Sequence, residues 1–327
     1  MSLPDVRLSR RSLVVGTAAA AVGSLARAQT YPGRPIRIVI PFPPGGGTDA
    51  MVRLLALKLR DALGQPVLVD NRPGGDTIIA AEIVANAPRD GYTLLVAHFS
   101  TMALNPHLYP KLPYDPVKDF APISQLTYTS IGLVAGKKLA ANNMQELVKY
   151  AKANPGKLTY GHSFLVAKMY GEYFKSAAGV DIVDVPYKGS GPILPALLSG
   201  EIDLAVTDLS PFVPHVESGT IRVLGTSGAH RYSQLPQVPT MRELGFPGLE
   251  LRTWFGLYAP AGTPTPILER LNAEVNKVFT DPAVVKDLQA RHGYDPVPST
   301  PQQLTALLKA DSGKWGPVIK QLGLKAQ

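Results

Sequence analysis

The sequence contains no cysteine among its 327 residues. This absence excludes disulfide bonds, thiolate catalysis, cysteine-ligated metals and a lipid anchor on an N-terminal cysteine. Histidine offers no replacement, because no H-x-x-x-H or H-E-x-x-H spacing occurs. We therefore expect neither a metal site nor a cofactor. The six histidines are His98, His107, His162, His215, His230 and His292.

Long hydrophobic runs are equally scarce, and the one near the N-terminus spans only residues 13–22. It follows the basic residues Arg7, Arg10 and Arg11, and an A-x-A site ends at Ala28. This pattern predicts an export signal at residues 1–28, cleaved after Ala28 and too short to span a bilayer. The arginine pair also resembles a twin-arginine signal, and the Sec route stays open. We expect a soluble protein of a bacterial periplasm.

Basic runs and aromatic-interleaved basic patches are also missing. The formal charge is +8, of which the predicted signal carries +3, and the remaining positive residues are scattered. This distribution is typical of a solvated surface that weakly steers anions. No nucleic-acid partner is expected.

Strand and helix patterns alternate along the chain, which predicts an α/β fold with parallel-rich sheets flanked by helices. Residues 124–133 and 249–258 are the stretches expected to connect two domains. The first domain would then be discontinuous, with residues 29–127 plus 256–327, and the second would span 128–255. The expected strands are 36–40, 67–69, 93–97, 158–160, 182–185, 202–207 and 222–226. Expected helices lie at 51–62, 78–87, 143–154, 168–178 and 193–199, and two more open at Thr265-Pro266 and Thr300-Pro301.

A glycine loop follows the first expected strand, in the stretch IVIPFPPGGGTDA that ends at Ala50. Unpaired backbone N–H groups at the start of the next helix favour a negatively charged ligand, and glycines let it approach closely. Asp49 or Thr48 is expected to cap the helix start. The alternative is that the glycines serve only the turn.

The same loop matches the dinucleotide fingerprint G-x-G-x-x-[G/A], with Asp70 twenty residues beyond Ala50. Three features oppose the dinucleotide interpretation. An exported protein would have to leave the cytoplasm without its cofactor. The turn before the glycines is rich in proline, and the Asp49 carboxylate would face the pyrophosphate. A hydrolase is a second alternative, because Ser163, Asp208 and His215 follow the order of an α/β-hydrolase triad. Its nucleophile elbow is incomplete, since Leu165 stands where the last glycine belongs.

Collinear motifs cover essentially the whole chain beyond residue 28, and they resemble the Bug family, the periplasmic receptors of tripartite tricarboxylate transporters. The first half carries Tyr31-Pro32, Pro43-Pro44-Gly45-Gly46, Asn71-Arg72-Pro73-Gly74, Asp90-Gly91-Tyr92 and Leu112-Pro113-Tyr114-Asp115-Pro116. The second half carries Val185-Pro186-Tyr187-Lys188-Gly189-Ser190, Asp203-Leu204, Val238-Pro239-Thr240, Trp254-Phe255-Gly256 and Ala259-Pro260-Ala261-Gly262.

This resemblance implies a two-domain "Venus flytrap" that closes on a small organic carboxylate and performs no catalysis. Its partners would be a mono- or dicarboxylate, or an aromatic acid, and the subunits of a membrane permease or a sensor. The protein itself would be a monomer. The ligand-binding residues expected on this basis are Phe42, Gly45, Gly46, Gly47, Thr48, Asp49, His98, Ser100, Thr101, His162, Ser163, Phe164, Gly189, Ser190 and Asp208.

One loop departs from the family pattern. Family members have a Ser/Gly-rich loop and a His-Leu pair after the strand near Tyr160, whereas here Lys168-Met169 stands in place of that pair. Phe164 in this loop and Phe99 after the third strand favour a more apolar or aromatic acid.

Overall fold

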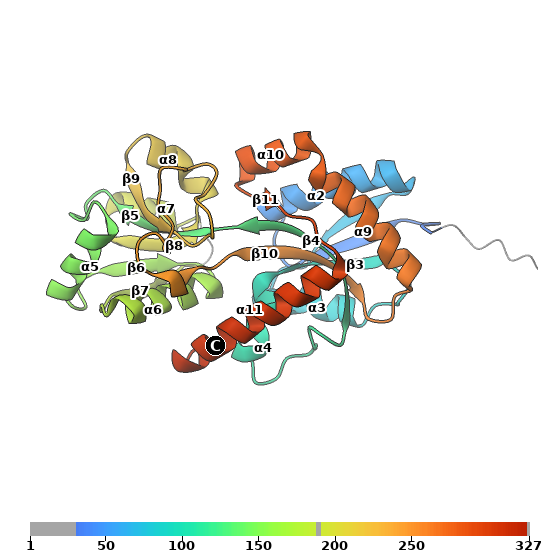
Figure 1. Cartoon of the computed structure of the whole chain (residues 1–327), viewed down its shortest axis with the longest axis horizontal. Helices are drawn as coiled ribbons and strands as arrows, with labels where there is room; N and C mark the ends of the chain where they lie inside the picture. Colours follow the sequence, from blue (N-terminus) through green and yellow to red (C-terminus); the bar gives the residue numbers. More distant parts are fainter. Residues whose placement is uncertain (1–30, 188–190, 326–327) are drawn as a thin grey trace, which may run out of the picture. The chain divides into compact units, whose positions relative to one another are not determined.

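The computed structural model describes residues 31–187 and 191–325 (Figure 1). The predicted export signal at 1–28 and the expected ligand residues Gly189 and Ser190 lie outside the described residues. Arg34–Gln327 form one compact unit. Within the part of the chain that the structure describes, no helix is both long and apolar enough to cross a bilayer.

The first of two sheets has six strands within the described residues, in the order β11-β4-β10-β3-β1-β2. One end of this sheet is parallel, because β1 pairs in parallel with β2 and β3. The other three pairs are antiparallel. The strands are β1 (Ile36–Ile40), β2 (Val67–Asn71), β3 (Thr93–His98), β4 (Phe120–Thr129), β10 (Thr253–Pro260) and β11 (Asp295–Pro296).

The second sheet has five strands in the described chain, in the order β7-β6-β8-β5-β9. β6 is parallel to β7 and β8, whereas β5 is antiparallel to β8 and β9. Each sheet thus has three parallel-paired strands at one end, as the alternation predicts, with antiparallel pairs at the other end. The strands are β5 (Ile131–Gly136), β6 (Thr159–His162), β7 (Val183–Pro186), β8 (Leu204–Asp208) and β9 (Ile221–Thr226).

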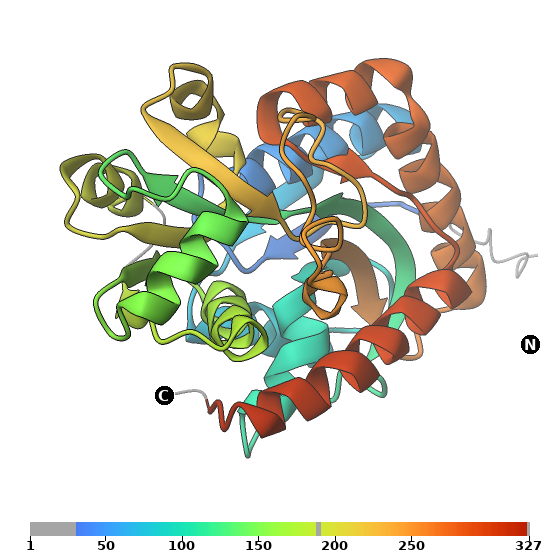
Figure 2. The ribbon, with the colours of Figure 1, turned by 60° about the vertical axis from the view of Figure 1, so that its left-hand side comes forward.

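Helices cover both sheets. α9 and α11 pack on β4, α2 packs beside α9, and α6 packs on β6 and β8. Figure 2 shows α2 (blue) alongside the orange C-terminal helices. The α-helices are α2 (Gly47–Leu63), α3 (Ile78–Ala85), α4 (Asn105–Leu108), α5 (Met144–Ala153), α6 (Leu165–Ala178), α7 (Ile193–Ser199), α8 (Val213–Glu217), α9 (Thr265–Thr280), α10 (Pro282–His292) and α11 (Pro301–Gln321). Short helical turns are η1 (Gly75–Thr77), η2 (Ser100–Leu104), η3 (Ser210–Phe212) and η4 (Pro247–Leu249).

The helix ends follow local sequence signals. The Asn143 side chain accepts a hydrogen bond from the Glu146 N–H at 2.9 Å, which caps α5 as predicted. Thr300 forms a capping box that opens α11. By contrast, α6 begins three residues before the predicted position 168. Its N-cap, Phe164, has extended backbone angles and offers no side-chain cap by which a sequence pattern could mark it.

The chain crosses from the first sheet to the second through a single residue. β4 ends at Thr129 and β5 begins at Ile131, so Ser130 alone connects them, within the stretch 124–133 expected to do so (Figure 1). The returning chain passes beside it. The Ile131 N–H donates to Ser227 Oγ at 3.1 Å, and the Leu251 N–H donates to the Ser227 carbonyl at 2.8 Å.

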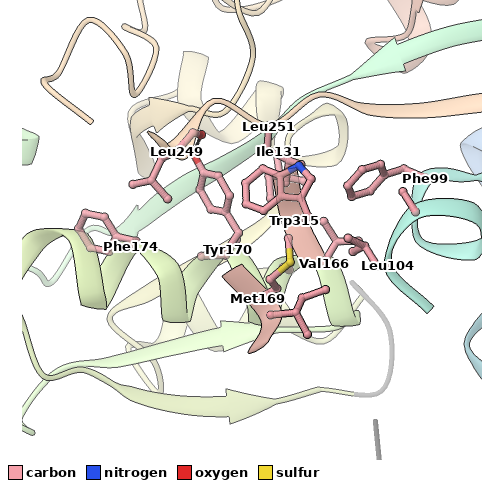
Figure 3. Packing of buried hydrophobic residues seen from close by; sticks show 14 of the residues in the cluster. Phe99, Leu104, Ile131, Val166, Met169, Tyr170, Phe174, Leu249, Leu251 and Trp315 are labelled. Carbon is pink, nitrogen blue, oxygen red and sulfur yellow. Dashed lines mark hydrogen bonds between the residues drawn. The ribbon is translucent and has the colours of Figure 1, made fainter. Parts of the chain in front are cut away.

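One hydrophobic cluster joins elements of both sheets. Figure 3 shows the Trp315 indole of α11 between Tyr170 of α6 on one side and Phe99 on the other, with Met169 of α6 below it, and all four residues are buried. The Tyr170 hydroxyl donates to the Leu249 carbonyl at 2.9 Å. This shared core means that α6 is stabilised by contacts with both halves of the fold.

Leu104→Ala tests that shared core. Leu104 is fully buried in it, so truncation should lower the free energy of unfolding by about 2–5 kcal/mol. Leu57→Ala is the matched control, because Leu57 on α2 is 47% exposed and should cost no more than about 0.5 kcal/mol. Urea unfolding of both variants measures the difference, and equal midpoints would contradict the assignment.

Candidate functional site

The strand order brings the loops of both sheets to the crossing at Ser130. β10 pairs with both His98 at the end of β3 and Thr129 at the end of β4, so these strand ends lie together. In the second sheet, Ile131 at the start of β5 pairs with Asp208 at the end of β8. The carboxyl ends of strands are where open α/β sheets bind ligands.

The glycine loop forms the start of α2. Gly46 is the N-cap, with φ −84° and ψ 172°, and Gly45 has a φ of +88° that favours glycine. Gly45 and Gly46 are exposed, and a Cβ added to either would meet nothing within 4 Å. By helix geometry the N–H groups of the first turn have no intrahelical partner. Open space therefore lies beside the first-turn N–H groups, at the positive end of a 17-residue helix.

Asp49 lies at the third position of α2, within its first turn, and its carboxylate is buried. Oδ2 accepts hydrogen bonds from the Gly45 N–H at 3.0 Å and from Arg53 Nε at 2.8 Å, and Oδ1 accepts one from Asn71 Nδ2 at 3.0 Å. The Arg53 hydrogen bond, aided by those from Gly45 and Asn71, lowers the pKa of Asp49 to about 2. Asp49 fixes the conformation of the glycine loop.

Asp70 does not have the environment that a dinucleotide site requires. Its carboxylate forms ion pairs with Arg37 Nε and Arg72 Nε, each at 2.9 Å. In the dinucleotide fingerprint this side chain would instead bind a ribose hydroxyl. With Asp49 also occupied, the geometry does not favour the dinucleotide alternative.

Four rings form what we call the aromatic wall beside the glycine loop: Phe42, His98, Phe255 and Tyr294. Phe42 contacts His98 and Phe255 with centroids 5.8 and 6.1 Å apart, and Phe255 contacts Tyr294 at 5.7 Å. The angles between these three ring pairs are 65–85°, in the edge-to-face range. Phe42 and Tyr294 are half-buried, whereas His98 and Phe255 are buried behind them.

His98 is the polar member of the aromatic wall. Burial lowers the pKa of its imidazole to about 4, so it is neutral at pH 7. The Ser100 N–H points at Nδ1 at 3.3 Å, and Ser100 Oγ lies 2.8 Å from the same atom. Because a backbone N–H can only donate, Nδ1 is an acceptor and the ring proton resides on Nε2.

Sequence reasoning did not identify Tyr294 as a site residue. It lies just after α10, and its hydroxyl is 3.4 Å from Thr48 Oγ1. A Cβ added to Gly47 would be 3.0 Å from the same hydroxyl. The two segments are 246 residues apart, so no local pattern could have linked them.

Two expected residues of the third-strand loop are inside the protein. Thr101 is fully buried, and its hydroxyl donates to Thr77 Oγ1 at 2.7 Å. Phe99 is also fully buried and packs on Trp254 with centroids 6.1 Å apart. Both side chains therefore support the loop, and His98 is the residue of this segment that belongs to the aromatic wall.

The predicted site residues after β6 differ in how accessible they are. His162 is buried, with Nε2 3.4 Å from Asp184 Oδ2, and Lys168 Nζ is 3.7 Å from the same oxygen. Burial lowers the pKa of the His162 imidazole despite that neighbour. Ser163 and Phe164 are half-buried at the start of α6. His162 thus belongs to a polar cluster on the strands, and the turn at Ser163 and Phe164 is more accessible.

Asp208 is the last residue of β8 and is half-buried. Desolvation raises the pKa of its carboxyl to about 6. Besides burial, this carboxylate raises the pKa of both Tyr232 and Tyr294. In the loop that follows Asp208, Ser210 Oγ donates to the Arg291 carbonyl of α10 at 3.4 Å, so residues from both sheets meet here.

The hydrolase alternative is not supported by the position of His215. His215 belongs to α8, and its carbonyl and Nδ1 both lie within hydrogen-bond distance of Thr220 Oγ1. Thr220 directly precedes β9, whose first residue pairs with Gly136 at the end of β5. Asp208 pairs with Ile131 at the start of β5, so His215 and Asp208 lie at opposite ends of this strand. The described residues also contain no group of three or more acidic or histidine side chains that could hold a metal ion.

Two α/β sheets joined by adjacent crossings, with strand-end loops gathered at the crossings, define a two-domain periplasmic binding protein fold. The family described as "Tripartite tricarboxylate transporter family receptor" matches residues 51–324, and the chain belongs to this family. BugT of Bordetella pertussis is 36% identical over 325 residues, covering 98% of this chain and 99% of BugT.

Two solved relatives have carboxylates in their names. A Rhodopseudomonas palustris protein described with adipate is 36% identical, with a TM-score of 0.81, and the match covers 90% of this chain and 99% of that one. MatC of the same species, described with bound malate, is 33% identical with a TM-score of 0.76, over 88% and 100% of the two chains.

Asp49→Asn tests the scaffolding role of this carboxylate. Because the folded-state pKa is lowered, its ionised form contributes stability above the unfolded value near 3.8, and that contribution disappears as the pH falls toward 2. The wild type should therefore lose more unfolding free energy than Asp49→Asn between pH 4 and pH 2. Urea unfolding across this window measures the two slopes; parallel curves would show that Asp49 does not hold the loop.

Proposed function

We propose that this protein is a periplasmic solute receptor that captures a small organic carboxylate by domain closure and delivers it to a tripartite tricarboxylate-type permease or to a sensor. It binds its ligand without transforming it. The observation that carries this proposal is the start of α2, where exposed Gly45 and Gly46 leave open space beside the first-turn N–H groups, which helix geometry leaves without an intrahelical partner.

A carboxylate suits this loop for physical reasons. Its two oxygens accept from backbone N–H groups, and the partial positive charge of the helix end stabilises the anion. Arg53, the cation at this loop, is already paired with Asp49. Relatives described with adipate and with malate support the same ligand class.

The two sheets would act as the two jaws of the receptor. The bounds predicted from the sequence are 29–127 plus 256–327 for the first jaw and 128–255 for the second. Because β4 ends at Thr129 and β10 begins at Thr253, we propose that the chain changes jaws at Ser130 and again just before Thr253. A ligand closes such a fold when its contacts are better in the closed state. The same proposal includes export by the twin-arginine or the Sec route, with cleavage after Ala28. It also includes a monomeric state and a permease partner.

The proposed ligand contacts fall into two groups. Residues of the first jaw are Phe42, Gly45, Gly46, Gly47, Thr48, His98 and Ser100. Those of the second jaw are Ser163, Phe164 and Asp208, with Gly189 and Ser190 as predicted from the sequence. The buried hydrogen bonds of Asp49 and Thr101, and the buried contact of His162 with Asp184, favour supporting roles for these three.

A ligand screen tests the function directly. Purified protein is heated with malate, adipate, hexanoate, benzoate or NAD, and its melting temperature is recorded. A ligand at 100 times its Kd should add about 2.7 kcal/mol of stability, which raises the melting temperature measurably. We expect at least one acid to do so and NAD to have no effect. A shift with NAD alone would overturn the proposal.

Gly46→Val tests whether the glycine loop is the binding site. Valine tolerates the backbone angles at this position, and its Cβ meets nothing in the unliganded protein, so the fold should persist. The side chain would fill the space in front of the α2 donors and should weaken acid binding at least about tenfold, as one lost charged hydrogen bond does. Gly313→Val on the exposed side of α11 is the control. Equal affinities by calorimetry would place the site elsewhere.

Closure predicts a change in size. Saturating acid should lower the radius of gyration, because the ligand favours the closed state. Small-angle scattering with and without the acid measures this, and an identical radius would contradict closure. Gly46→Val at the same acid concentration should give the ligand-free value.

A further inference from the structure

We propose that Tyr294 determines ligand specificity, and that with Phe42 it selects a carboxylic acid with a flat ring over open-chain acids. This inference rests on the proposed function, since it concerns the body of the acid whose carboxylate the α2 loop would hold. The aromatic wall and the position of the Tyr294 hydroxyl carry it.

The aromatic wall presents rings where a ligand held at α2 would extend. Phe42 directly precedes the proline–glycine turn in the sequence, and the Tyr294 hydroxyl lies against Gly47 and Thr48. Both residues are half-buried, so each keeps some accessible surface. Phe255 is buried between them and contacts both. Aromatic pairs gain most in edge-to-face or offset geometry, and this wall already uses edge-to-face contacts.

The aromatic wall also carries no positive charge. His98 is neutral because burial lowers its pKa to about 4. Phe42, Phe255 and Tyr294 contribute only apolar surface and one hydroxyl. A second carboxylate placed against these four rings would lose hydration without gaining an ion pair, which is costly. The wall therefore fits an uncharged ring better than the second carboxylate of an open-chain diacid.

The Tyr294 hydroxyl has a separate function. It is 3.4 Å from Thr48 Oγ1, which is long for a hydrogen bond between two oxygens, so it can re-aim toward a ligand. Burial, with a smaller effect from Asp208, raises the pKa of this phenol, which keeps the donor proton in place at neutral pH. The hydroxyl would thus donate to the carboxylate beside the α2 N–H groups, while the ring contacts the body of the acid.

Gly47 is explained by the same arrangement. A Cβ there would lie 3.0 Å from the Tyr294 hydroxyl oxygen and 3.5 Å from Cζ, so a larger residue must displace the tyrosine. The third glycine of the loop therefore makes room for Tyr294, whereas Gly45 and Gly46 face open space. A substitution at Gly47 can therefore move the Tyr294 hydroxyl without removing it.

The experiment compares benzoate, hexanoate and adipate by calorimetry against the wild type, Tyr294→Phe and Tyr294→Ala. We expect benzoate to bind the wild type most tightly. Tyr294→Phe keeps the ring and should weaken all three acids by a similar factor, of roughly tenfold or more for a hydrogen bond to a charge. Tyr294→Ala should in addition reduce the preference for benzoate over hexanoate by roughly two- to tenfold, the value of an aromatic pair. Gly47→Ala should cause part of the loss of affinity that Tyr294→Phe causes.

Tyr150→Phe and Tyr150→Ala on α5 are the matched controls, because Tyr150 is 39% exposed and far from this loop in the sequence. They should change no affinity. Acid binding to the wild type without preference for benzoate, or a preference that survives in Tyr294→Ala, would overturn this inference and leave the proposed function intact. If no acid binds the wild type, the proposed function fails and the inference fails with it. Melting temperatures of all variants verify that each one is folded.

Discussion

The one-residue crossing at Ser130 is the constraint on which the candidate site depends. Thr129 ends a strand of one sheet and Ile131 begins a strand of the other, so their Cα atoms are at most about 7 Å apart. The returning chain is hydrogen-bonded to the same place through Ser227. With both crossings at one point, the strand-end loops of the two sheets face a common region, and relative motion of the sheets must be a rotation about that point.

Much of the fold could be predicted because its signals are local. A buried run marked β1, Gly64 ended α2, and Asn143 and Thr300 capped α5 and α11. The antiparallel strands were harder to predict, since β10 and β5 carry no sign of the partners they meet across the sequence. The early start of α6 was missed for a related reason: an extended Phe164 leaves no capping residue to detect.

In the candidate site, too, local features could be predicted and contacts between distant segments could not. The glycine loop was visible in the sequence, but the role of Asp49 depended on Arg53 and on Asn71, which lies 22 residues away. A first-turn carboxylate can cap a helix, face a ligand or bind its own loop, and composition does not choose among these. Tyr294 was invisible because its importance comes from contacts with Thr48 and Phe255, which only the folded chain brings together.

The position of β10 has a consequence for how the chain is made. β3 and β4 do not pair with each other, because both pair with β10, which lies between them in the sheet. During synthesis, the first 129 residues therefore emerge with β4 unpaired and with β3 open on one edge, and the sheet is completed only when Thr253–Pro260 follows. Open edges invite pairing with other chains, and such distant contacts fold slowly. The half of the protein that is synthesised first is the half that is completed last.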